Sequence, residues 1–356
     1  MSKHKFKYNW ELKNTIFTKD KGKVFSCFAC GGGSSFGYKL AGFDVIGAND
    51  IDPKMKEVYI ENHNPKYYFL ESITTLAKRK DLPKELYELD ILDGSPPCSS
   101  FSMAGNREKD WGKEKKFREG QEVQVLDTLF FDFIDLAKEL QPKVVVAENV
   151  KGLLLGNAIE YVRKIYDEFD KAGYYCQHFL LDASKMGVPQ RRERVFFICL
   201  RKDKASKFLY YKDMFTEVPK IEMNFNEESI LFKEFTDKQG RNLSDNMTLV
   251  WNYRAFGDGD MSLGCLRKEN RRSFFSQNFI YENETPKTLT SHEDSLVLFE
   301  VPKYTSKNEA CNIGSFPQDY NFLKVKPHYL IGMSVPPVVM AQISFQIHLQ
   351  WLQYLK

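Results

Sequence analysis

The sequence predicts an α/β fold with a mostly parallel, twisted sheet and helices on both of its faces. Two observations carry this prediction. Short apolar runs that are typical of buried strands alternate with segments of helical spacing between residues 24 and 200. A glycine-rich stretch also follows the first apolar run and opens a helix, which is how many nucleotide-binding α/β domains begin.

Length and composition indicate a globular protein. The 356 residues, 42% hydrophobic and 14% aromatic, suffice for a large core and for two domains. We expect no membrane span, because no run approaches ~18 uncharged apolar residues, and no signal peptide, so the expected compartment is the cytosol. Seven cysteines fit a reducing environment, and Cys27 and Cys30 lack the second pair that would complete a metal site. We therefore expect no metal.

The first strand, the glycine loop and the second strand predict a nucleoside-binding site. Val24–Ala29 is strand-like, and Cys30-Gly-Gly-Gly leads into a helix-compatible segment at 38–43. Glycines let the backbone approach a ligand, and the helix start offers N–H groups to an anion. Val45–Asp52 is a second strand, and Asp50 stands at the usual distance for a ribose ligand. The pattern leaves open whether the cofactor is NAD or S-adenosylmethionine.

The alternation continues along the chain. Residues 1–22 are expected to be a polar extension that packs near the core. The further elements that we expect are a helix at Lys54–Asn62, a strand at Tyr67–Leu70, a helix or loop at Lys78–Glu88, a strand at Leu89–Asp93, a helix at Thr128–Leu140, a strand at Pro142–Val150, a strand that ends at Ile198 and an apolar helix at Val338–Leu355.

A cysteine stands just after the predicted strand Leu89–Asp93. Gly94 and a proline pair stop the strand where parallel strands open onto a ligand cleft, so we expect Cys98 to face that cleft. A thiolate is a strong nucleophile once its pKa is lowered. A buried structural cysteine is the alternative for any single cysteine, but the position after Pro-Pro favours the nucleophile.

Two further strand ends carry polar side chains. Glu148 and Asn149 end a valine-rich strand, where a carboxylate requires neutralisation or hydrogen bonds. Gln190 and three arginines between 191 and 194 precede the next strand, and arginine suits phosphates and base edges, with a surface salt-bridge cluster as the alternative. The charged residues 103–118 predict a loop that closes over a ligand, or else a solvated loop.

Five motifs in this order resemble the DNA (cytosine-5) methyltransferases. They are Phe28-Ala-Cys-Gly-Gly-Gly, Pro97-Cys98, Glu148-Asn149-Val150, Gln190-Arg-Arg-Glu-Arg194 and Gly332-Met-Ser-Val-Pro-Pro337. The resemblance covers about residues 24–200 and 312–356, and it argues against an NAD dehydrogenase, in which Pro-Pro-Cys has no role. It implies a Rossmann-like domain that binds S-adenosylmethionine and releases S-adenosylhomocysteine, plus a smaller, irregular target recognition domain.

The resemblance also implies the chemistry. Cys98 attacks carbon 6 of cytosine while Glu148 binds N3, carbon 5 takes the methyl group, and loss of the carbon 5 proton with elimination of Cys98 restores the ring. Asn149 orients the loop around the base, and Arg192 and Arg194 stabilise the ring and its phosphates. Because the attacked atoms are stacked inside a duplex, the base must be flipped out.

The same resemblance places the cofactor against ten residues. An aromatic ring stacks on the adenine, glycines lie beneath the methionine part, and a carboxylate holds the ribose. The set is Phe28, Gly32, Gly33, Asp50, Ile51, Ile73, Pro96, Leu129, Ser334 and Val335.

The resemblance divides the chain into an extension at 1–22, a catalytic domain at 23–204 and 312–356, and a target recognition domain at 205–311. Basic side chains position phosphates, and loops read base edges in the major groove. The long stretch between Cys98 and Thr128 is also expected to contact DNA. The expected DNA contacts are Ser99, Ser100, Arg107, Gln190, Arg254, Arg271, Arg272 and Thr288.

Several positions depart from the family pattern. Cys30 stands where the first loop glycine is usual, Ser72 where an aspartate meets the adenine amino group, and Met333 where an asparagine is usual. Asn308 and Asn312 replace arginines. These changes bear on cofactor affinity more than on the chemistry.

The expected protein is a monomeric, cytoplasmic, nucleoid-associated enzyme of prokaryotic or phage type. It acts on duplex DNA beside a separate cognate restriction endonuclease and has no membrane partner. Two alternatives stay open. The transfer RNA cytosine methyltransferases share Pro-Pro-Cys, although the long insertion dotted with basic residues favours duplex DNA. The other alternative is a DNA-binding subunit with an impaired cofactor site.

Overall fold

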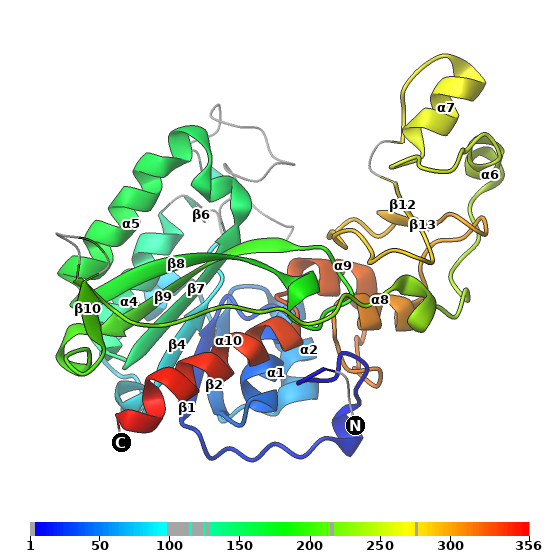
Figure 1. The fold of residues 1–356 in the computed structure, drawn as a ribbon. Coiled ribbons are helices and arrows are strands. Elements are labelled where there is room, and N and C mark those ends of the chain that lie inside the picture. Colours follow the sequence, from blue (N-terminus) through cyan, green and yellow to red (C-terminus); the bar gives the residue numbers. More distant parts are fainter. Residues whose placement is uncertain are drawn as a thin grey trace. The chain divides into compact units, whose positions relative to one another are not determined.

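The computed structural model of the chain describes residues 4–97, 114–115, 124–125, 128–211, 213, 217–274 and 277–355. Packing divides the chain into two compact units, whose elements are labelled in Figure 1. Unit 1 comprises residues 1–16, 182–192 and 225–339, and unit 2 comprises 17–181, 193–224 and 340–356. These limits follow packing and differ from the predicted functional domains, whose boundaries stay a prediction.

Unit 2 is built on a seven-stranded sheet with the order β3-β2-β1-β4-β7-β9-β8. Its strands are β1 (Lys23–Cys27), β2 (Asp44–Asp50), β3 (Tyr67–Leu70), β4 (Ile91–Gly94), β7 (Val144–Val150), β8 (Tyr174–Asp182) and β9 (Glu193–Arg201). The pairs from β3 to β7 are parallel, and β9 is antiparallel to β7. The predicted α/β fold with a mostly parallel sheet is confirmed.

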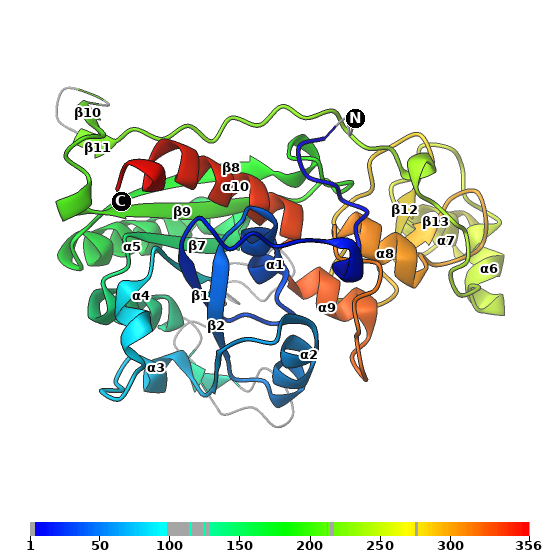
Figure 2. The same ribbon diagram turned by 90° about the horizontal axis from the view of Figure 1, so that it is seen from below.

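Helices cover both faces of this sheet, as the two views in Figures 1 and 2 show. They are α1 (Gly33–Leu40), α2 (Pro53–His63), α3 (Ile73–Leu76), α4 (Leu129–Leu140), α5 (Ile159–Lys171) and α10 (Pro337–Gln350). All of them belong to unit 2, except that residues 337–339 at the start of α10 belong to unit 1. The unit also holds the short pairs β5 (Glu114–Lys115) with β6 (Gln124–Val125) and β10 (Leu209–Tyr211) with β11 (Glu217–Pro219).

Side chains alternate between the two faces of the sheet, and both faces are buried. Phe25 of β1, Leu92 of β4 and Val145 of β7 pack in one cluster with residues of α3, α4 and α5. On the side of α1 and α10, His348 packs edge-on against Phe43, with ring centroids 6.1 Å apart. Burial on both faces explains why these strands are almost continuous hydrophobic runs in the sequence.

Unit 1 contains more irregular chain. Its helices and strands are α6 (Asp245–Trp251), α7 (Ser262–Glu269), β12 (Asn278–Ile280), β13 (Leu296–Leu298), α8 (Lys307–Ile313) and α9 (Pro327–Met333). β12 and β13 pair in parallel, and a small core gathers around Trp251, Met261 and Phe279. The N-terminal residues pack on this unit, because the indole N–H of Trp10 donates to the carbonyl of Ser315 at 2.9 Å.

The expectation that no run approaches ~18 uncharged apolar residues was wrong. The helical stretch Pro327–Tyr354 contains no Asp, Glu, Lys or Arg. By length and composition it is apolar enough to cross a membrane, with a mean hydropathy of 1.5. In the structure, 83% of its most apolar 18-residue stretch is buried, and a mostly buried core helix meets the same criteria of length and composition.

Candidate active site

The strand order of unit 2 reverses between β1 and β4, and such a switch point is where α/β sheets bind ligands. The last parallel pair joins Cys27 of β1 to Gly94 of β4, so the glycine loop and the segment Ser95–Pro97 leave the sheet at the same edge. Gly94 also pairs with Ala147 of β7, which puts Glu148 one residue further along at that edge.

The loop after β1 is shaped by left-handed backbone. Phe28, Cys30 and Gly32 have φ angles of 53°, 48° and 79°. Gly32 cannot be replaced freely, since a Cβ there would lie 2.0 Å from Nε2 of His63. Cys30, where the family pattern has glycine, adopts the glycine-like conformation with a side chain attached, which costs on the order of 1 kcal/mol.

A neutral imidazole forms the floor of this loop. His63 lies between the rings of Phe36 and Tyr59, with centroid distances of 3.8 and 4.3 Å. Burial lowers the pKa of His63 well below its ordinary value, and the charge of Lys39 acts in the same direction. The sequence analysis missed His63, which follows Asn62 at the end of a helix and carries no motif.

Asp50 fastens the glycine loop. Its carboxylate accepts hydrogen bonds from the main-chain N–H groups of Cys30 at 2.8 Å and Asp52 at 2.9 Å. A carboxylate can accept up to four hydrogen bonds, so these two main-chain bonds do not by themselves use every acceptor position of Asp50. Phe28 packs near Phe133, with centroids 6.4 Å apart. An aromatic ring, a carboxylate and the start of α1, with its main-chain N–H groups, fit S-adenosylmethionine chemically.

The other predicted cofactor residues have ordinary structural roles as well. Ile73 and Leu129 are buried in the core cluster of unit 2, and Pro96 is also buried. Ser72, which replaces an aspartate of the family pattern, caps α3 by accepting a hydrogen bond from the N–H of Thr75 at 3.1 Å. Ile51 is half-buried and Gly33 opens α1. Ser334 and Val335 belong to unit 1.

Glu148 is balanced by an arginine. Its Oε1 lies 3.0 Å from Nε of Arg194, and the two side chains are only 11% and 21% exposed. Asn149 donates from Nδ2 to the carbonyl of Pro96 at 3.1 Å and accepts from the N–H of Val150 at 2.8 Å. Asn149 therefore ties the Pro-Pro segment to β7, next to the Glu148–Arg194 pair.

The residues that follow Pro97 include four predicted site residues. Cys98, Ser99, Ser100 and Arg107 lie outside the described residues, as does most of the long stretch up to Thr128. Their roles stay predictions. Within the described ranges, no three His, Cys, Asp or Glu side chains gather as metal ligands.

A second buried carboxyl, which the sequence analysis missed, lies one residue before Gly94. Asp93 is 1% exposed, and it accepts hydrogen bonds from the hydroxyls of Ser26 at 2.7 Å and Tyr38 at 3.2 Å. Burial raises the pKa of Asp93 to about 7, and the two hydroxyls offset part of this rise. The signal was present in the sequence, as an aspartate inside the apolar strand that leads to Pro-Pro-Cys.

Comparison with known proteins identifies the family. The sequence matches the family described as C-5 cytosine-specific DNA methylase over residues 22–348. The chain belongs to this family. It is 38% identical over 181 residues to the type II methyltransferase M.FnuDI of Fusobacterium nucleatum and 36% identical over 191 residues to M.NgoPII of Neisseria gonorrhoeae. These matches cover 51% and 53% of the chain and about half of each relative, 47% and 51%.

A solved structure supports the fold of this C-5 cytosine-specific methylase chain. The Dnmt2 methyltransferase of S. pombe superposes with a TM-score of 0.59 at 18% identity, which covers 94% of this chain and 99% of that one. At this identity the likeness speaks for the fold alone.

Two polar residues of the methylase chain that precede β9 bridge the main chain of unit 1. Arg192 is 5% exposed, and its guanidinium donates to the carbonyls of Leu289 and Gly332 at 3.2 Å and of Ser334 at 3.3 Å. Gln190, 1% exposed, donates to the carbonyl of Ile313 at 2.9 Å and accepts from the N–H of Leu289 at 3.1 Å. The DNA contact predicted for Gln190 is corrected to this bridging role, because both ends of its amide are used.

The remaining predicted DNA contacts differ in accessibility. Arg271 and Arg272 are exposed, and Arg271 pairs with Glu269 at 2.9 Å. The hydroxyl of Thr288 donates to the carbonyl of Arg191 at 2.7 Å. The guanidinium of Arg254 stacks on a tryptophan within unit 1.

Proposed function

We propose that this protein transfers a methyl group from S-adenosylmethionine to carbon 5 of a cytosine that is flipped out of a specific duplex DNA sequence. One observation supports this most. Three features lie at one edge of the sheet: the glycine loop that Asp50 holds, the Pro-Pro segment that Asn149 holds, and the Glu148–Arg194 ion pair. They do so in a chain of the C-5 cytosine-specific DNA methylase family. Phe28, Asp50 and the start of α1 would hold S-adenosylmethionine, which supplies the electrophilic methyl group.

The proposed chemistry begins with the thiolate of Cys98, which adds to carbon 6 of the cytosine ring. Glu148 donates a proton to N3, which draws electrons away from the ring, and Arg194 stabilises the Glu148 carboxylate that remains; the proton returns to Glu148 when the thiolate is eliminated. Carbon 5 is then nucleophilic and accepts the methyl group. Loss of the carbon 5 proton to water and breakage of the bond between sulfur and carbon 6 return Cys98 and the aromatic base. Asn149 keeps the segment before Cys98 aligned throughout.

The biological setting is part of the proposal. M.FnuDI and M.NgoPII are named as type II methyltransferases, which supports a restriction-modification role with a separate endonuclease of the same specificity. We place the target recognition domain at 205–311. The proposed enzyme works as a monomer in the cytoplasm, at the nucleoid.

Methyl transfer from radiolabelled S-adenosylmethionine tests the substrate class. We expect label in duplex DNA and none in transfer RNA. Glu148→Gln should lower the rate of methyl transfer by about 10²- to 10⁴-fold, because a positioned general acid usually accelerates a reaction by this factor. A matched control is Glu193→Gln, because Glu193 is an exposed neighbour that pairs with Lys151. Label in transfer RNA alone would contradict the proposal. The absence of both S-adenosylmethionine binding and methyl transfer would favour the DNA-binding subunit with an impaired cofactor site.

A further inference from the structure

A turn between α6 and α7 of unit 1 presents an exposed aromatic ring. Phe256 is 88% exposed, although its ring stands edge-on to Tyr281 and Phe299 with centroids 5.4 and 6.2 Å away. A single exposed apolar side chain is common on protein surfaces. Phe256 differs from such residues because hydrogen bonds and an ion pair hold the turn that carries it.

Main-chain hydrogen bonds close the turn on both sides of the ring. The N–H of Ala255 donates to a carboxylate oxygen of Asp258 at 2.8 Å, and the N–H of Asp258 donates to the carbonyl of Ala255 at 3.1 Å. Gly257 has a φ of 92°, and its N–H donates to the hydroxyl of Tyr281 at 3.0 Å. That hydroxyl donates in turn to the carbonyl of Asp258 at 2.9 Å. The main chain is thus held at Ala255, Gly257 and Asp258, on both sides of Phe256.

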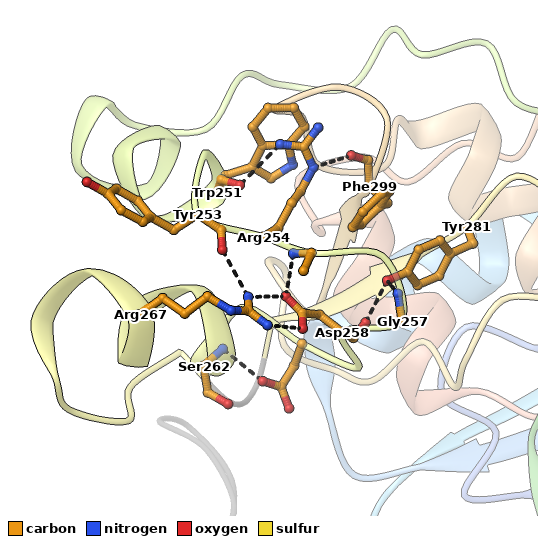
Figure 3. A network of polar contacts seen from close by, with 11 residues as sticks. Trp251, Tyr253, Arg254, Gly257, Asp258, Ser262, Arg267, Tyr281 and Phe299 are labelled. Atoms are coloured by element: carbon orange, nitrogen blue, oxygen red, sulfur yellow. Dashed lines mark hydrogen bonds and ion pairs between the residues drawn. The ribbon is translucent and has the colours of Figure 1, made fainter.

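An ion pair between a buried carboxylate and an exposed arginine anchors the turn to α7. Both carboxylate oxygens of Asp258, which is 4% exposed, lie 2.7 Å from guanidinium nitrogens of Arg267 (Figure 3). Arg267 also donates to the carbonyl of Tyr253 at 2.9 Å. The hydrogen bonds from Arg267 lower the pKa of Asp258, so the pair stays charged at neutral pH. Such two-point geometry fixes orientation as well as distance.

Arg254 braces the other end of the turn. Its guanidinium carbon lies 3.0 Å from the ring centroid of Trp251, and its Nε donates to the carbonyl of Phe299 at 2.7 Å (Figure 3). A further bond reaches the carbonyl of Trp251 at 3.2 Å. Arg254 is half-buried, and the DNA contact predicted for it stays a prediction.

We propose that Phe256 is a specificity-determining contact that enters the base stack of duplex DNA as an apolar wedge. This inference rests on the proposed function. Flipping a base requires stacked base pairs to part, and proteins that part them insert rigid apolar side chains such as Phe between base steps. A side chain that is exposed yet immobilised loses little freedom when it is inserted.

The charges around the turn favour DNA as the partner. Residues 205–311 carry 17 Asp and Glu against 14 Lys and Arg, so this region as a whole is acidic. The segment 253–272 around Phe256 is the reverse, with five Lys and Arg against three Asp and Glu. One protruding ring with Tyr253 beside it also offers far less than the ~800 Å² that each partner of a stable protein complex buries.

Binding of duplex DNA to the full-length protein tests the wedge. The probe is a duplex with the sequence that the wild-type enzyme methylates, identified by bisulfite sequencing of treated plasmid DNA. Phe256→Ala should weaken binding by about 5- to 140-fold, which is the stacking free energy of one base on an aromatic ring converted to a ratio of dissociation constants. Phe256→Leu should retain most of the affinity because it keeps an apolar wedge. The control is Ile16→Ala, which removes another large apolar side chain, 91% exposed, and should change nothing.

A mismatch at the target pair separates a wedge from an ordinary contact. Because unpairing and unstacking cost least at a mismatch, the duplex that carries one should restore most of the binding that Phe256→Ala loses. Equal losses on matched and mismatched duplexes, or wild-type affinity for Phe256→Ala, would overturn the inference. If the wild-type enzyme methylates the duplex and Phe256→Ala binds it with the same affinity, only the wedge fails. If the wild type neither binds nor methylates any duplex, the proposed function fails with it.

Discussion

Asp93→Asn should stabilise the protein increasingly as the pH rises. Burial raises the pKa of Asp93 from the ordinary 3.8 to about 7. The native state therefore holds a proton that the unfolded chain releases above pH 4, and stability is lost as pH rises through 7. At ~1.36 kcal/mol per pH unit, the full loss is about 4 kcal/mol, of which about 3 kcal/mol falls between pH 5 and pH 7.

Asparagine fits the same site without a charge. The hydroxyls of Ser26 and Tyr38 now both donate to the carboxylate, at 2.7 and 3.2 Å. Either hydroxyl can rotate to accept a hydrogen bond from the asparagine amide while the other continues to donate to its oxygen. The substitution therefore keeps a partner for the amide oxygen and for one amide N–H, and it removes the titration.

Urea denaturation followed by circular dichroism at pH 5, 6 and 7 measures the effect. The difference in free energy of unfolding between Asp93→Asn and wild type should grow by about 3 kcal/mol over this range and level off above it. Asp135→Asn, which neutralises an exposed carboxylate on α4, serves as the control and should show no such growth. A difference for Asp93→Asn that does not change with pH would refute the reasoning.

Three further predictions concern the cofactor loop and the acid. Asp50→Asn should weaken S-adenosylmethionine binding in calorimetry by about 10- to 100-fold, since asparagine cannot accept from two main-chain N–H groups and a ribose together; an unchanged affinity would contradict this role. Glu148→Gln should leave that affinity intact while methyl transfer falls, and a parallel loss of both would point to misfolding instead. Gly32→Ala should lower the melting temperature more than Gly173→Ala, because both positions have positive φ but only Gly32 meets His63, while nothing lies within 4 Å at Gly173. Equal melting temperatures for the two variants would show that the glycine loop can move to accommodate the added methyl group.

Much of the fold was predictable because doubly buried strands leave a strong apolar signal. The strand at Tyr67–Leu70 was predicted with its observed limits, and the helix at Thr128–Leu140 differs by one residue. β8 (Tyr174–Asp182) was missed because it lies at the sheet edge, where several of its side chains are exposed and the apolar run is interrupted. The antiparallel direction of β9 was also not predicted, since strand direction depends on the connection and not on local composition.

In the candidate site, short motifs predicted the position of some residues, but contacts between distant parts of the chain were not predicted. The motifs located the Glu148 strand end and the Asp50 loop, because residue type and spacing carry their chemistry. They did not show that Asn149 holds Pro96, because that contact joins distant parts of the chain. Residue type alone also misassigned Gln190, whose amide binds main-chain groups, and it did not show that Arg254 stacks on an aromatic ring.

Covalent trapping tests the central claim most directly. The enzyme is incubated with S-adenosylmethionine and a sequence-diverse pool of duplexes that contain 5-fluorocytosine, whose carbon 5 cannot lose a proton, and the products are separated on a denaturing gel. We predict an adduct with wild type and with Cys176→Ala, which alters a half-buried cysteine of β8. Cys98→Ala should give none. An adduct that persists in Cys98→Ala, or the absence of any adduct with wild type, would contradict the account.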